Sequence, residues 1–387
     1  MLVKTFSAAV SGIEAVPVTI EVDVTRGVRY MLVGLPDTAV KESQQRIESA
    51  LRAVGLRWPG RQVIINMAPA DIRKEGSSYD LPLAVGILVA SEMVSGSRLD
   101  GMLLTGELSL DGAVRPVRGV LPMALRAREE GFRCMMVPAL NAPEAAVVEG
   151  LDIYGVNTLG EVLGYLRGDT PPAPVTVNIR ELFTRKGNIY DTDFADVKGQ
   201  ENVKRALEVA VAGNHNAIMV GPPGSGKTML ARRLPGILPP LTLEEALETT
   251  RIHSVAGKID NHVPLMTCRP FRSPHHTSSD IALVGGGQVP QPGEISLAHN
   301  GILFLDELPE FKRSVLEVLR QPLEDRVITV ARARMSCNYP ASVMLIASMN
   351  PCPCGFHNHP SRECTCAPGM VQRYMSRISG PLLDRID

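Results

Sequence analysis

The sequence motif with the clearest chemical potential is the octapeptide Gly221–Thr228, "GPPGSGKT". It fits the pattern G-x-x-x-x-G-K-[ST], in which glycines let the backbone N–H groups wrap a phosphate. The apolar residues before it predict a strand, and the residues after it predict a helix, whose N-terminus favours an anion. We expect Lys227 to reach the β- and γ-phosphates of a nucleotide and Thr228 to bind Mg²⁺. The other residues of this phosphate loop, expected to surround the phosphates, are Gly221, Pro222, Pro223, Gly224, Ser225 and Gly226.

Two acidic residues follow an apolar run, 302–305, in the sequence "ILFLDE". Such a run predicts a central strand of a parallel sheet, and ligands bind at the carboxyl ends of these strands. We expect Asp306 to hold Mg²⁺ and Glu307 to polarise the water that attacks the γ-phosphate. Asn350 ends the next apolar run, where its amide is expected to orient that water or to touch the phosphate. ATP and Mg²⁺ are therefore the expected cofactors.

A cluster of cysteines follows closely, in "CPCGFHNHPSRECTC". Four thiolates could bind Zn²⁺ tetrahedrally, although two C-x-C pairs are tighter than the usual C-x-x-C spacing. The loop between the pairs, which contains His357 and His359, has little apolar content and needs a cross-link to stay ordered. Free thiols in a reducing compartment are the alternative. The four candidate zinc ligands are Cys352, Cys354, Cys364 and Cys366.

The composition indicates globular domains. The 387 residues exceed one ordinary domain, and 44 % of them are hydrophobic. The formal net charge of −1 shows no overall basic excess, so any contact with nucleic acid must be local. The N-terminus makes a poor signal peptide, and the longest apolar run, 81–90, is too short to cross a bilayer. We expect a cytoplasmic protein with no membrane partner.

Residues 168–178, "GDTPPAPVTVN", have the composition of a linker, because their prolines exclude a helix. We therefore expect a first domain at 1–167, a linker at 168–190 and a second domain at 191–387. The first domain is predicted to be mixed α/β, with strands at 16–27, 29–36 and 61–69, helices at 37–55 and 79–94, and a strand end that runs into a helix at 113–132. In the second domain a helix at 201–213 precedes short apolar strands that alternate with helices. This alternation predicts an α/β fold whose parallel sheet is covered on both faces.

The order of these motifs resembles AAA+ ATPases, and more narrowly their Mg-chelatase-like branch, the ComM/YifB group. The resemblance rests on "RPFRSPHHTSSDIALVGGG", "PGEISLAHNGILFLDELPEF", "MNPCPCG" and "SGPLLDRID", which cover most of the second domain. It implies a ring, expected to be a hexamer, that hydrolyses ATP, and a helical lid following the last residue of this chain. It also implies that Arg385 of "LLDR" reaches a neighbouring subunit's nucleotide as an arginine finger. Arg377 is the alternative finger, and a surface ion pair with Asp384 or Asp387 is the ordinary structural interpretation.

The first domain resembles the Lon-protease-like domain through "SSYDLPLAVGIL" and "LLTGELSLDGAVRPVRGV". Ser78 falls at the position of the Lon nucleophile. The Ser–Lys dyad of that family needs a lysine a few residues after "PVRGV", where this chain has "LPM". The nearby Arg126 and Arg128 are poor bases because arginine stays protonated. We expect a Lon-protease-like scaffold without proteolysis, which serves ring assembly or nucleic-acid contact.

Two basic segments are candidates for contact with DNA. The resemblance places both the loop 269–276, "RPFRSPHH", and the predicted hairpin 326–340 near the pore of the ring. Such a stripe could follow a phosphate backbone without reading sequence, whereas ordinary solvated or interface arginines are the alternative. The candidate DNA-contacting residues are Arg269, Arg272, His275, His276, Arg332 and Arg334, and Arg326 begins the same hairpin.

The resemblance to the ComM/YifB group implies a motor that acts on single-stranded or branched DNA. Its expected role is branch migration of recombination intermediates during natural transformation. The rival interpretation is a chelatase-type motor that remodels a partner protein for insertion of Mg²⁺ into a porphyrin. The Lon-protease-like domain and the arginine-bearing hairpin favour the DNA motor, and the missing lysine disfavours an ATP-dependent protease.

Overall fold

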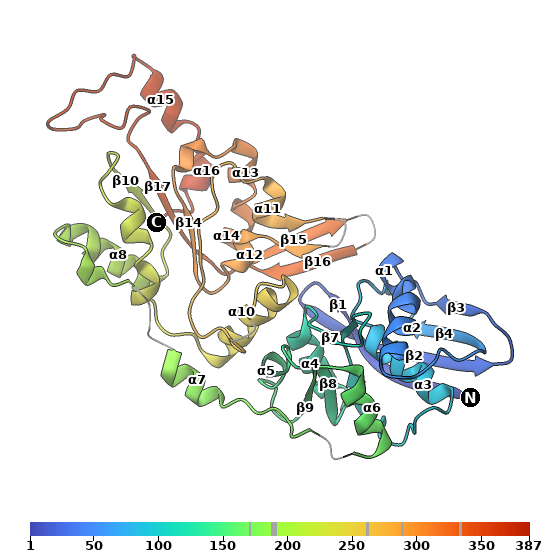
Figure 1. Cartoon of the computed structure of the whole chain (residues 1–387). Coiled ribbons are helices and arrows are strands. Elements are labelled where there is room, and N and C mark those ends of the chain that lie inside the picture. Colours follow the sequence, from blue (N-terminus) through green and yellow to red (C-terminus); the bar gives the residue numbers. More distant parts are fainter. Residues whose placement is uncertain (170–171, 187–191, 261–262, 288–289, 333–334) are drawn as a thin grey trace. The chain divides into compact units, whose positions relative to one another are not determined.

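The structure is a computed structural model that describes residues 1–169, 172–186, 192–260, 263–287, 290–332 and 335–387 (Figure 1). Its contacts divide the chain into two compact units. The first unit comprises Met1–Ile179 and His253–Leu265, and the second comprises Arg180–Ile252 and Met266–Asp387. Each unit has its own sheet and its own hydrophobic core. Within the described ranges, no helix is both long and apolar enough to cross a membrane.

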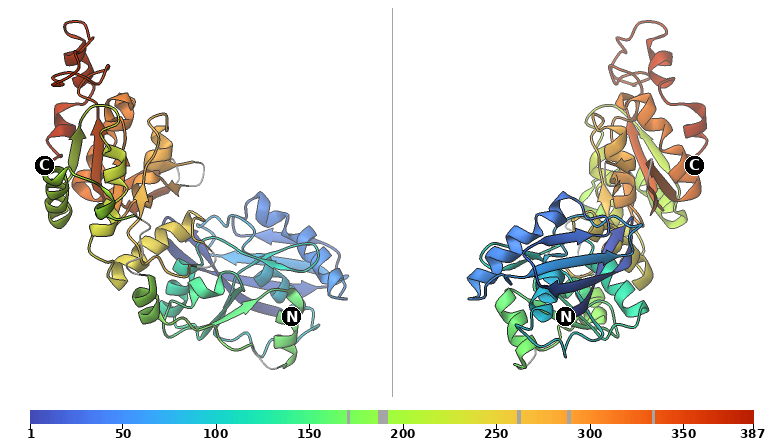
Figure 2. Two further views of the ribbon diagram at one scale, coloured as in Figure 1. Left: turned by 60° about the vertical axis from the view of Figure 1, so that its left-hand side comes forward. Right: turned by 90° about the vertical axis from the view of Figure 1, so that its right-hand side faces the viewer.

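The first unit is built on a seven-stranded mixed sheet. Its strands, with the small β6/β7 hairpin beside them, are β1 (Leu2–Ser11), β2 (Glu14–Thr25), β3 (Tyr30–Val33), β4 (Gln62–Ala68), β5 (Met102–Leu104), β6 (Glu107–Leu108), β7 (Val114–Arg115), β8 (Cys134–Pro138) and β9 (Asp152–Val156). The order in the sheet is β3-β4-β2-β1-β5-β8-β9, and Figure 2 shows the long β1 and β2 strands in blue. β1 pairs antiparallel with β2 and parallel with β5, so it lies in the middle of the sheet. The sequence analysis did not predict β1.

The helices of the first unit pack on this sheet. They are α1 (Thr38–Lys41), α2 (Ser43–Ala53), α3 (Asp80–Ala90), α4 (Val120–Glu129), α5 (Ala142–Ala145) and α6 (Leu159–Arg167). Every residue of α3 is buried, as its sequence "DLPLAVGILVA" predicts for a helix that is apolar on all sides. Gly86 lies so close to β2 that an added Cβ would stand 2.7 Å from Cγ2 of Val22. The predicted buried helix at 79–94 is therefore confirmed, with a close contact that only glycine allows.

The first unit contains a segment, residues 253–265, that comes from much later in the sequence. The hydroxyl of Ser254 donates a hydrogen bond to the buried carboxylate of Glu144. The Gly119 N–H donates to the carbonyl of Ser254 at 3.2 Å, and the Leu121 N–H donates to Glu144 at 2.9 Å. Burial raises the pKa of Glu144 despite these donors. The sequence does not predict that residues 253–265 join the first unit, because nothing in their local pattern indicates where they pack.

The second unit is built on a four-stranded parallel sheet. Its strands are β10 (Ala217–Val220), β11 (Phe271–Arg272), β14 (Ile302–Leu305) and β17 (Met344–Met349), in the order β10-β17-β14-β11. All three pairings are parallel, and every residue of β14 and β17 is buried. The parallel sheet that the sequence predicts is therefore confirmed. Because the strands run the same way, their carboxyl ends meet at one edge, where such sheets bind ligands.

The remaining elements are short helices and hairpins. The helices are α7 (Ile179–Lys186), α8 (Glu201–Gly213), α9 (Lys227–Ala231), α10 (Leu243–Val255), α11 (Asp280–Val284), α12 (Glu294–Leu297), α13 (Arg313–Glu317), α14 (Arg320–Asp325), α15 (Met370–Met375) and α16 (Gly380–Leu383), with 3-10 turns η1 (Phe194–Asp196), η2 (Leu234–Ile237) and η3 (Leu308–Glu310). The hairpin strands are β12 (Gly285–Gly286), β13 (Gln291–Pro292), β15 (Val327–Arg332) and β16 (Met335–Pro340). α8 and the β15/β16 hairpin lie where the sequence predicts them. α7 lies inside the segment 168–190, which is predicted from the sequence to be a linker.

A forked ion pair fixes the start of α3 in the first unit. The guanidinium of Arg46 on α2 donates to both carboxylate oxygens of Asp80, at 2.6 and 2.8 Å. Asp80 is almost fully buried, and the Leu108 N–H adds a third donor at 3.2 Å. Burial raises the pKa of Asp80 to about 6, and the contact with Arg46 opposes this shift. Without Arg46, the carboxylate would be left buried with no opposite charge.

We predict that Arg46→Ala lowers the free energy of unfolding of the first unit by about 3 kcal/mol, the scale measured when one partner of a buried pair is removed. Arg52→Ala is the matched control on the same helix, because Arg52 makes only an exposed pair with Glu48 at 2.8 Å and should contribute little. Urea unfolding followed by fluorescence of Trp58, the single tryptophan of the chain, reports on this unit. Equal stability of the two variants would contradict the prediction.

Candidate nucleotide site and its surroundings

The phosphate loop links β10 to α9 in the second unit, in the order that the sequence predicts. Gly226 precedes α9 with a φ of 83°, a left-handed conformation that favours glycine. The ammonium of Lys227 donates to the carbonyls of Gly221 at 2.8 Å and Pro222 at 3.0 Å. Desolvation lowers the pKa of Lys227, and the nearby charge of Asp306 opposes that shift. A partly buried cation thus lies inside a loop whose backbone is shaped for an anion.

Thr228 and Asp306 meet at the carboxyl edge of the sheet. The hydroxyl of Thr228 donates to Oδ2 of Asp306 at 2.7 Å, and the hydroxyl of Ser348, near the end of β17, donates to Oδ1. Side chains from α9, β17 and the end of β14 therefore converge. Hydroxyl and carboxylate oxygens are the donors that Mg²⁺ prefers, so this set fits the predicted ion. When bound, Mg²⁺ would neutralise charge on the phosphates.

Glu307, the next residue, has an unusual backbone and one close partner. Its φ of 56° is left-handed, which is uncommon for a residue other than glycine. Its carboxylate is 55 % exposed and lies 3.4 Å from Nδ1 of His276, whose ring packs edge-on against Phe311. The structure therefore brings a residue predicted to contact DNA beside the residue predicted to activate water. The sequence does not indicate this contact, because His276 and Glu307 follow two strands, β11 and β14, that are neighbours in the sheet but distant in the chain.

The end of β17 contacts the phosphate loop at two points. Oδ1 of Asn350 accepts a hydrogen bond from the ammonium of Lys227 at 3.3 Å. The carbonyl of Met349 accepts one from the N–H of Gly221 at 3.2 Å. Asn350 therefore lies where its amide could reach a phosphate held by Lys227.

An apolar pocket adjoins the phosphate loop. Its walls include Val203, Met219 and Leu230, and at its rim the side-chain amide of Gln200 donates to the carbonyl of Ser225 at 3.0 Å. Apolar walls beside a phosphate site suit the base of a nucleotide. The sequence analysis missed these residues. No sequence signal indicates them, because the exposure of Val203 on α8, at 39 %, is a property of the folded chain.

The four clustered cysteines meet in space, and their ligand atoms all lie within 4.8 Å of one another. The sulfur of Cys352 lies 3.3 Å from that of Cys354 and 3.8 Å from that of Cys364, and the sulfurs of Cys354 and Cys364 are 3.6 Å apart. The backbone N–H of His357 donates to the sulfur of Cys352 at 3.2 Å, and that of Phe356 lowers the pKa of Cys354 to about 5. Desolvation and the neighbouring sulfurs raise the pKa of Cys364 and of Cys366 despite their own backbone donors. No disulfide joins the cysteines of the described residues. Donors of this kind stabilise thiolates, which are the form that binds a metal.

The two candidate finger arginines both make ion pairs within the chain. Arg385, beyond α16, pairs with Glu324 of α14 rather than with the neighbouring aspartates. Arg377 pairs with Glu310 of η3 at 3.1 Å. Arg385 is the less exposed of the two, since 27 % of its side chain is exposed against 52 % for Arg377. Either arginine would therefore have to leave its glutamate partner before it could act as a finger on a nucleotide in a neighbouring subunit.

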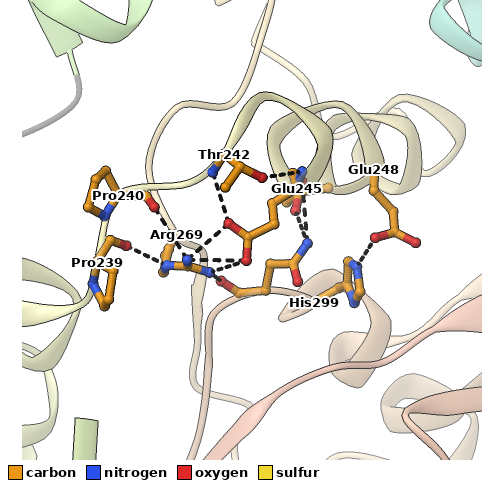
Figure 3. Close-up of polar contacts among 9 residues, drawn as sticks. Pro239, Pro240, Thr242, Glu245, Glu248, Arg269 and His299 are labelled. Carbon is orange, nitrogen blue, oxygen red and sulfur yellow. Dashed lines mark hydrogen bonds and ion pairs between the residues drawn. The ribbon is translucent and has the colours of Figure 1, made fainter. Parts of the chain in front are cut away.

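Arg269 of the basic loop is held within its own unit (Figure 3). Its guanidinium pairs with Glu245 at 3.1 Å and donates to the carbonyl of Asn300 at 2.7 Å, and only 13 % of the side chain is exposed. Arg272 makes a fork with Glu294, with distances of 2.6 and 2.7 Å. These contacts give both arginines structural roles in the second unit, which the sequence analysis did not assign to them.

The other candidate DNA-contacting residues differ in how they are placed. His275 is exposed, with Nδ1 2.9 Å from the hydroxyl of Thr277. Arg332 ends β15, but its side chain and the whole of Arg334 lie outside the described residues. Arg326 precedes the hairpin and donates to a backbone carbonyl at 2.7 Å.

Ser78, in the first unit, lies half-buried in the turn before α3. Its carbonyl accepts a hydrogen bond from the Gly106 N–H at 2.9 Å. α4, which follows "PVRGV", carries no lysine. Lys74, which the sequence analysis did not consider, is fully buried with its ammonium donating to the carbonyl of Pro69, and desolvation lowers its pKa.

The strand, phosphate loop, short helix and acidic strand end together define a P-loop nucleotide-binding protein. The family model described as magnesium chelatase, subunit ChlI, matches residues 193–387, and another, described as subunit ChlI of Mg-chelatase, matches residues 20–141. An uncharacterised protein of Mycobacterium tuberculosis is 47 % identical over 386 residues, covering 99 % of this chain and 75 % of its own.

Competence protein ComM of Haemophilus influenzae is 44 % identical over 385 residues, 99 % of this chain and 74 % of its own. The uncharacterised protein YifB of Escherichia coli is 44 % identical over 383 residues, 98 % of this chain and 73 % of its own. The chain therefore belongs to the Mg-chelatase-like ComM/YifB family, as the motifs predict, and membership implies ATPase activity. Lon protease 2 of Bacillus subtilis is 30 % identical over 132 residues, 34 % of this chain and 23 % of its own.

We predict that Lys227→Ala abolishes ATP binding, because the cation that faces the phosphates is lost. Glu307→Gln should bind ATP normally but hydrolyse it about 10²–10⁴-fold more slowly, the usual contribution of a general base. Lys312→Ala, which removes an exposed lysine outside the site, is the control and should match the wild type. Equilibrium titration with ATP and a phosphate-release assay measure the two effects. Unchanged turnover in Glu307→Gln would remove Glu307 from this role.

Proposed function

We propose that the protein is an ATP-hydrolysing ring motor that acts on single-stranded or branched DNA, as a helicase or translocase. The observation that carries the proposal is the convergence of Lys227, Thr228, Asp306 and Asn350 at one edge of the parallel sheet. In this assignment Glu307 activates the water, and Arg385 supplies charge to the site of the neighbouring subunit in a hexamer. The similarity to a competence protein supports DNA as the substrate, in branch migration during natural transformation.

The finer architecture is part of the same proposal. Residues 1–167 form a Lon-protease-like domain, 168–190 a linker, and 191–387 an AAA+ core. The match to Lon protease 2 supports the first assignment. We assign this domain no proteolysis, because the position of the catalytic lysine is filled by "LPM" and the ammonium of Lys74 is engaged by a carbonyl. The domain then serves ring assembly or nucleic-acid contact in the cytoplasm.

We also propose that the cysteine cluster binds one Zn²⁺. A tetrahedral ion about 2.3 Å from each thiolate would hold neighbouring sulfurs about 3.8 Å apart. The three sulfur–sulfur separations of 3.3 to 3.8 Å in the structure lie near that value. A disulfide would need about 2.05 Å, and an iron–sulfur cluster would place several atoms between the thiolates and separate them further. The sulfur spacing thus favours a single ion.

DNA is proposed to contact the exposed part of the loop 269–276 and the tip of the β15/β16 hairpin. His276 connects that loop to Glu307, so a strand bound there could alter the position of the carboxylate that activates water. The alternative, a chelatase-type motor that remodels a protein for Mg²⁺ insertion, is supported by the magnesium-chelatase family models and by 28 % identity over 193 residues to the magnesium-chelatase 67 kDa subunit of Heliobacterium mobile. The first unit and the similarity to a competence protein favour DNA.

We predict that forked or single-stranded DNA raises the ATPase rate of the full-length protein. A bound strand acts as the substrate of the motor, so hydrolysis should increase by several-fold and the effect should weaken as salt rises, because phosphate contacts release counterions. Phosphate release with and without DNA, at two salt concentrations, measures this. A rate that DNA leaves unchanged at low salt would contradict the DNA motor and leave the ATPase itself untouched.

We predict that Arg385→Ala binds ATP nearly normally but hydrolyses it ~10³–10⁵-fold more slowly, the effect of removing a finger in other phosphoryl-transfer enzymes. Mixing it with Lys227→Ala should restore activity, because some junctions then combine an intact site with an intact finger. Arg373→Ala, an exposed arginine on α15, is the control. Mixed rings that form but remain inactive would exclude Arg385 and leave Arg377 as the finger.

A further inference from the structure

The cysteine loop, residues 352–366, lies against the phosphate loop. An added Cβ on Gly355 would stand 2.5 Å from Cδ and 3.2 Å from Cγ of Pro223, so the backbone of Gly355 is in direct contact with the Pro223 ring. Gly355 is buried, and its N–H donates to the carbonyl of Cys352 at 2.9 Å, which closes the turn that presents it. The centre of the phosphate loop therefore packs on the first turn of the cysteine loop.

A second connection runs through the backbone. Cys352 is fully buried and follows Asn350 by two residues, and Asn350 accepts a hydrogen bond from Lys227 at 3.3 Å. The cysteine loop is thus anchored at the strand end that contacts Lys227, and it returns to contact Pro223. Any movement of Cys352 and Cys354 is transmitted to both sides of the phosphate loop.

The cysteine loop has few other means of holding this shape. Most of its residues between His357 and Thr365 are exposed. Its one phenylalanine, Phe356, is only partly buried, and its ring contacts Arg362 at 5.0 Å and the ring of His359 at 5.6 Å. With so little apolar surface to bury, the free energy that orders the loop must come from the cross-link between sulfurs.

We infer that the metal-loaded cysteine loop is a brace for the phosphate loop, so that a metal bound by the four thiolates sets the affinity for nucleotide. This inference rests on the zinc site proposed above and goes beyond it. The brace holds Pro223 and the backbone around it in the shape that receives phosphates. Loss of the ion frees the first turn of the cysteine loop, and the phosphate loop then has to be ordered by the nucleotide itself, at the expense of affinity.

The first part of the experiment concerns the ion. Full-length protein purified without added metal should contain about one zinc per chain by elemental analysis. Removal of zinc with a chelator, followed by return of Mg²⁺, should weaken binding of a fluorescent ATP analogue by about tenfold, and added zinc should restore it. Zinc that is present but can be removed without any change in affinity overturns the brace and leaves the zinc site standing. Absence of zinc overturns both.

The second part tests the contact without touching a ligand. Gly355→Ala should retain zinc and weaken nucleotide binding by about tenfold, because the new methyl group displaces Pro223. Gly369→Ala is the matched control: Gly369 has nearly the same φ, 77° against 83°, but an added Cβ meets no atom within 4 Å. Both variants add a methyl group to a residue with a left-handed φ, so a difference in nucleotide affinity between them reports on the contact with Pro223.

Thermal unfolding and hydrogen exchange of the peptide containing residues 221–228 accompany both measurements. Faster exchange in Gly355→Ala and in the zinc-free protein, with melting similar to that of Gly369→Ala, is the result expected of a local brace. Equal nucleotide affinities in Gly355→Ala and Gly369→Ala, with zinc bound to both, would overturn it. Should Gly355→Ala not fold, the zinc-removal measurement on the wild type still decides.

Discussion

The hydrogen bond from Thr228 to Asp306 joins two segments on which the whole candidate site depends. Thr228 belongs to the helix that follows β10, and Asp306 ends β14, yet β17 lies between these strands in the sheet. The bond can form only when all three strands run in the same direction and stop at the same edge. The buried strands β14, which is wholly apolar, and β17, whose one polar residue is Ser348, secure that alignment. Chemistry at the edge is therefore a consequence of packing in the core.

Features encoded in a short run of residues could be predicted from the sequence. The phosphate loop, the acidic end of β14 and α3, which is apolar after Asp80, each carry their signal within about twelve residues, and each lies where it is expected. The cysteine cluster could be predicted as a set, because its members lie within fifteen residues of one another. Local patterns thus sufficed for the parts of the nucleotide site that lie in one segment.

Features that depend on pairing between distant segments could not be predicted. Nothing in "RPFRSPHH" indicates that His276 meets Glu307, because that contact follows from the position of β11 beside β14. The charge of Arg269 and Arg272 in this segment predicts contact with DNA. In the structure, however, Arg269 pairs with a glutamate 24 residues away in the sequence, and Arg272 with one 22 residues away. Charge alone does not distinguish a cation that faces a ligand from one that completes a fold. β1 was missed for a related reason, since its place in the centre of the sheet is set by β2 and β5.

The segment 253–265 also has a consequence for how the protein is made. The first unit needs the hydroxyl and carbonyl of Ser254 to satisfy Glu144 and Gly119, so its final contacts wait for residues synthesised well after its own sheet. During synthesis, domains usually fold in order from the N-terminus. Here β10 and the phosphate loop leave the ribosome before the first unit is complete. The two units must therefore fold partly in parallel, and a chain arrested between residues 179 and 253 would carry a buried carboxylate with one of its donors missing.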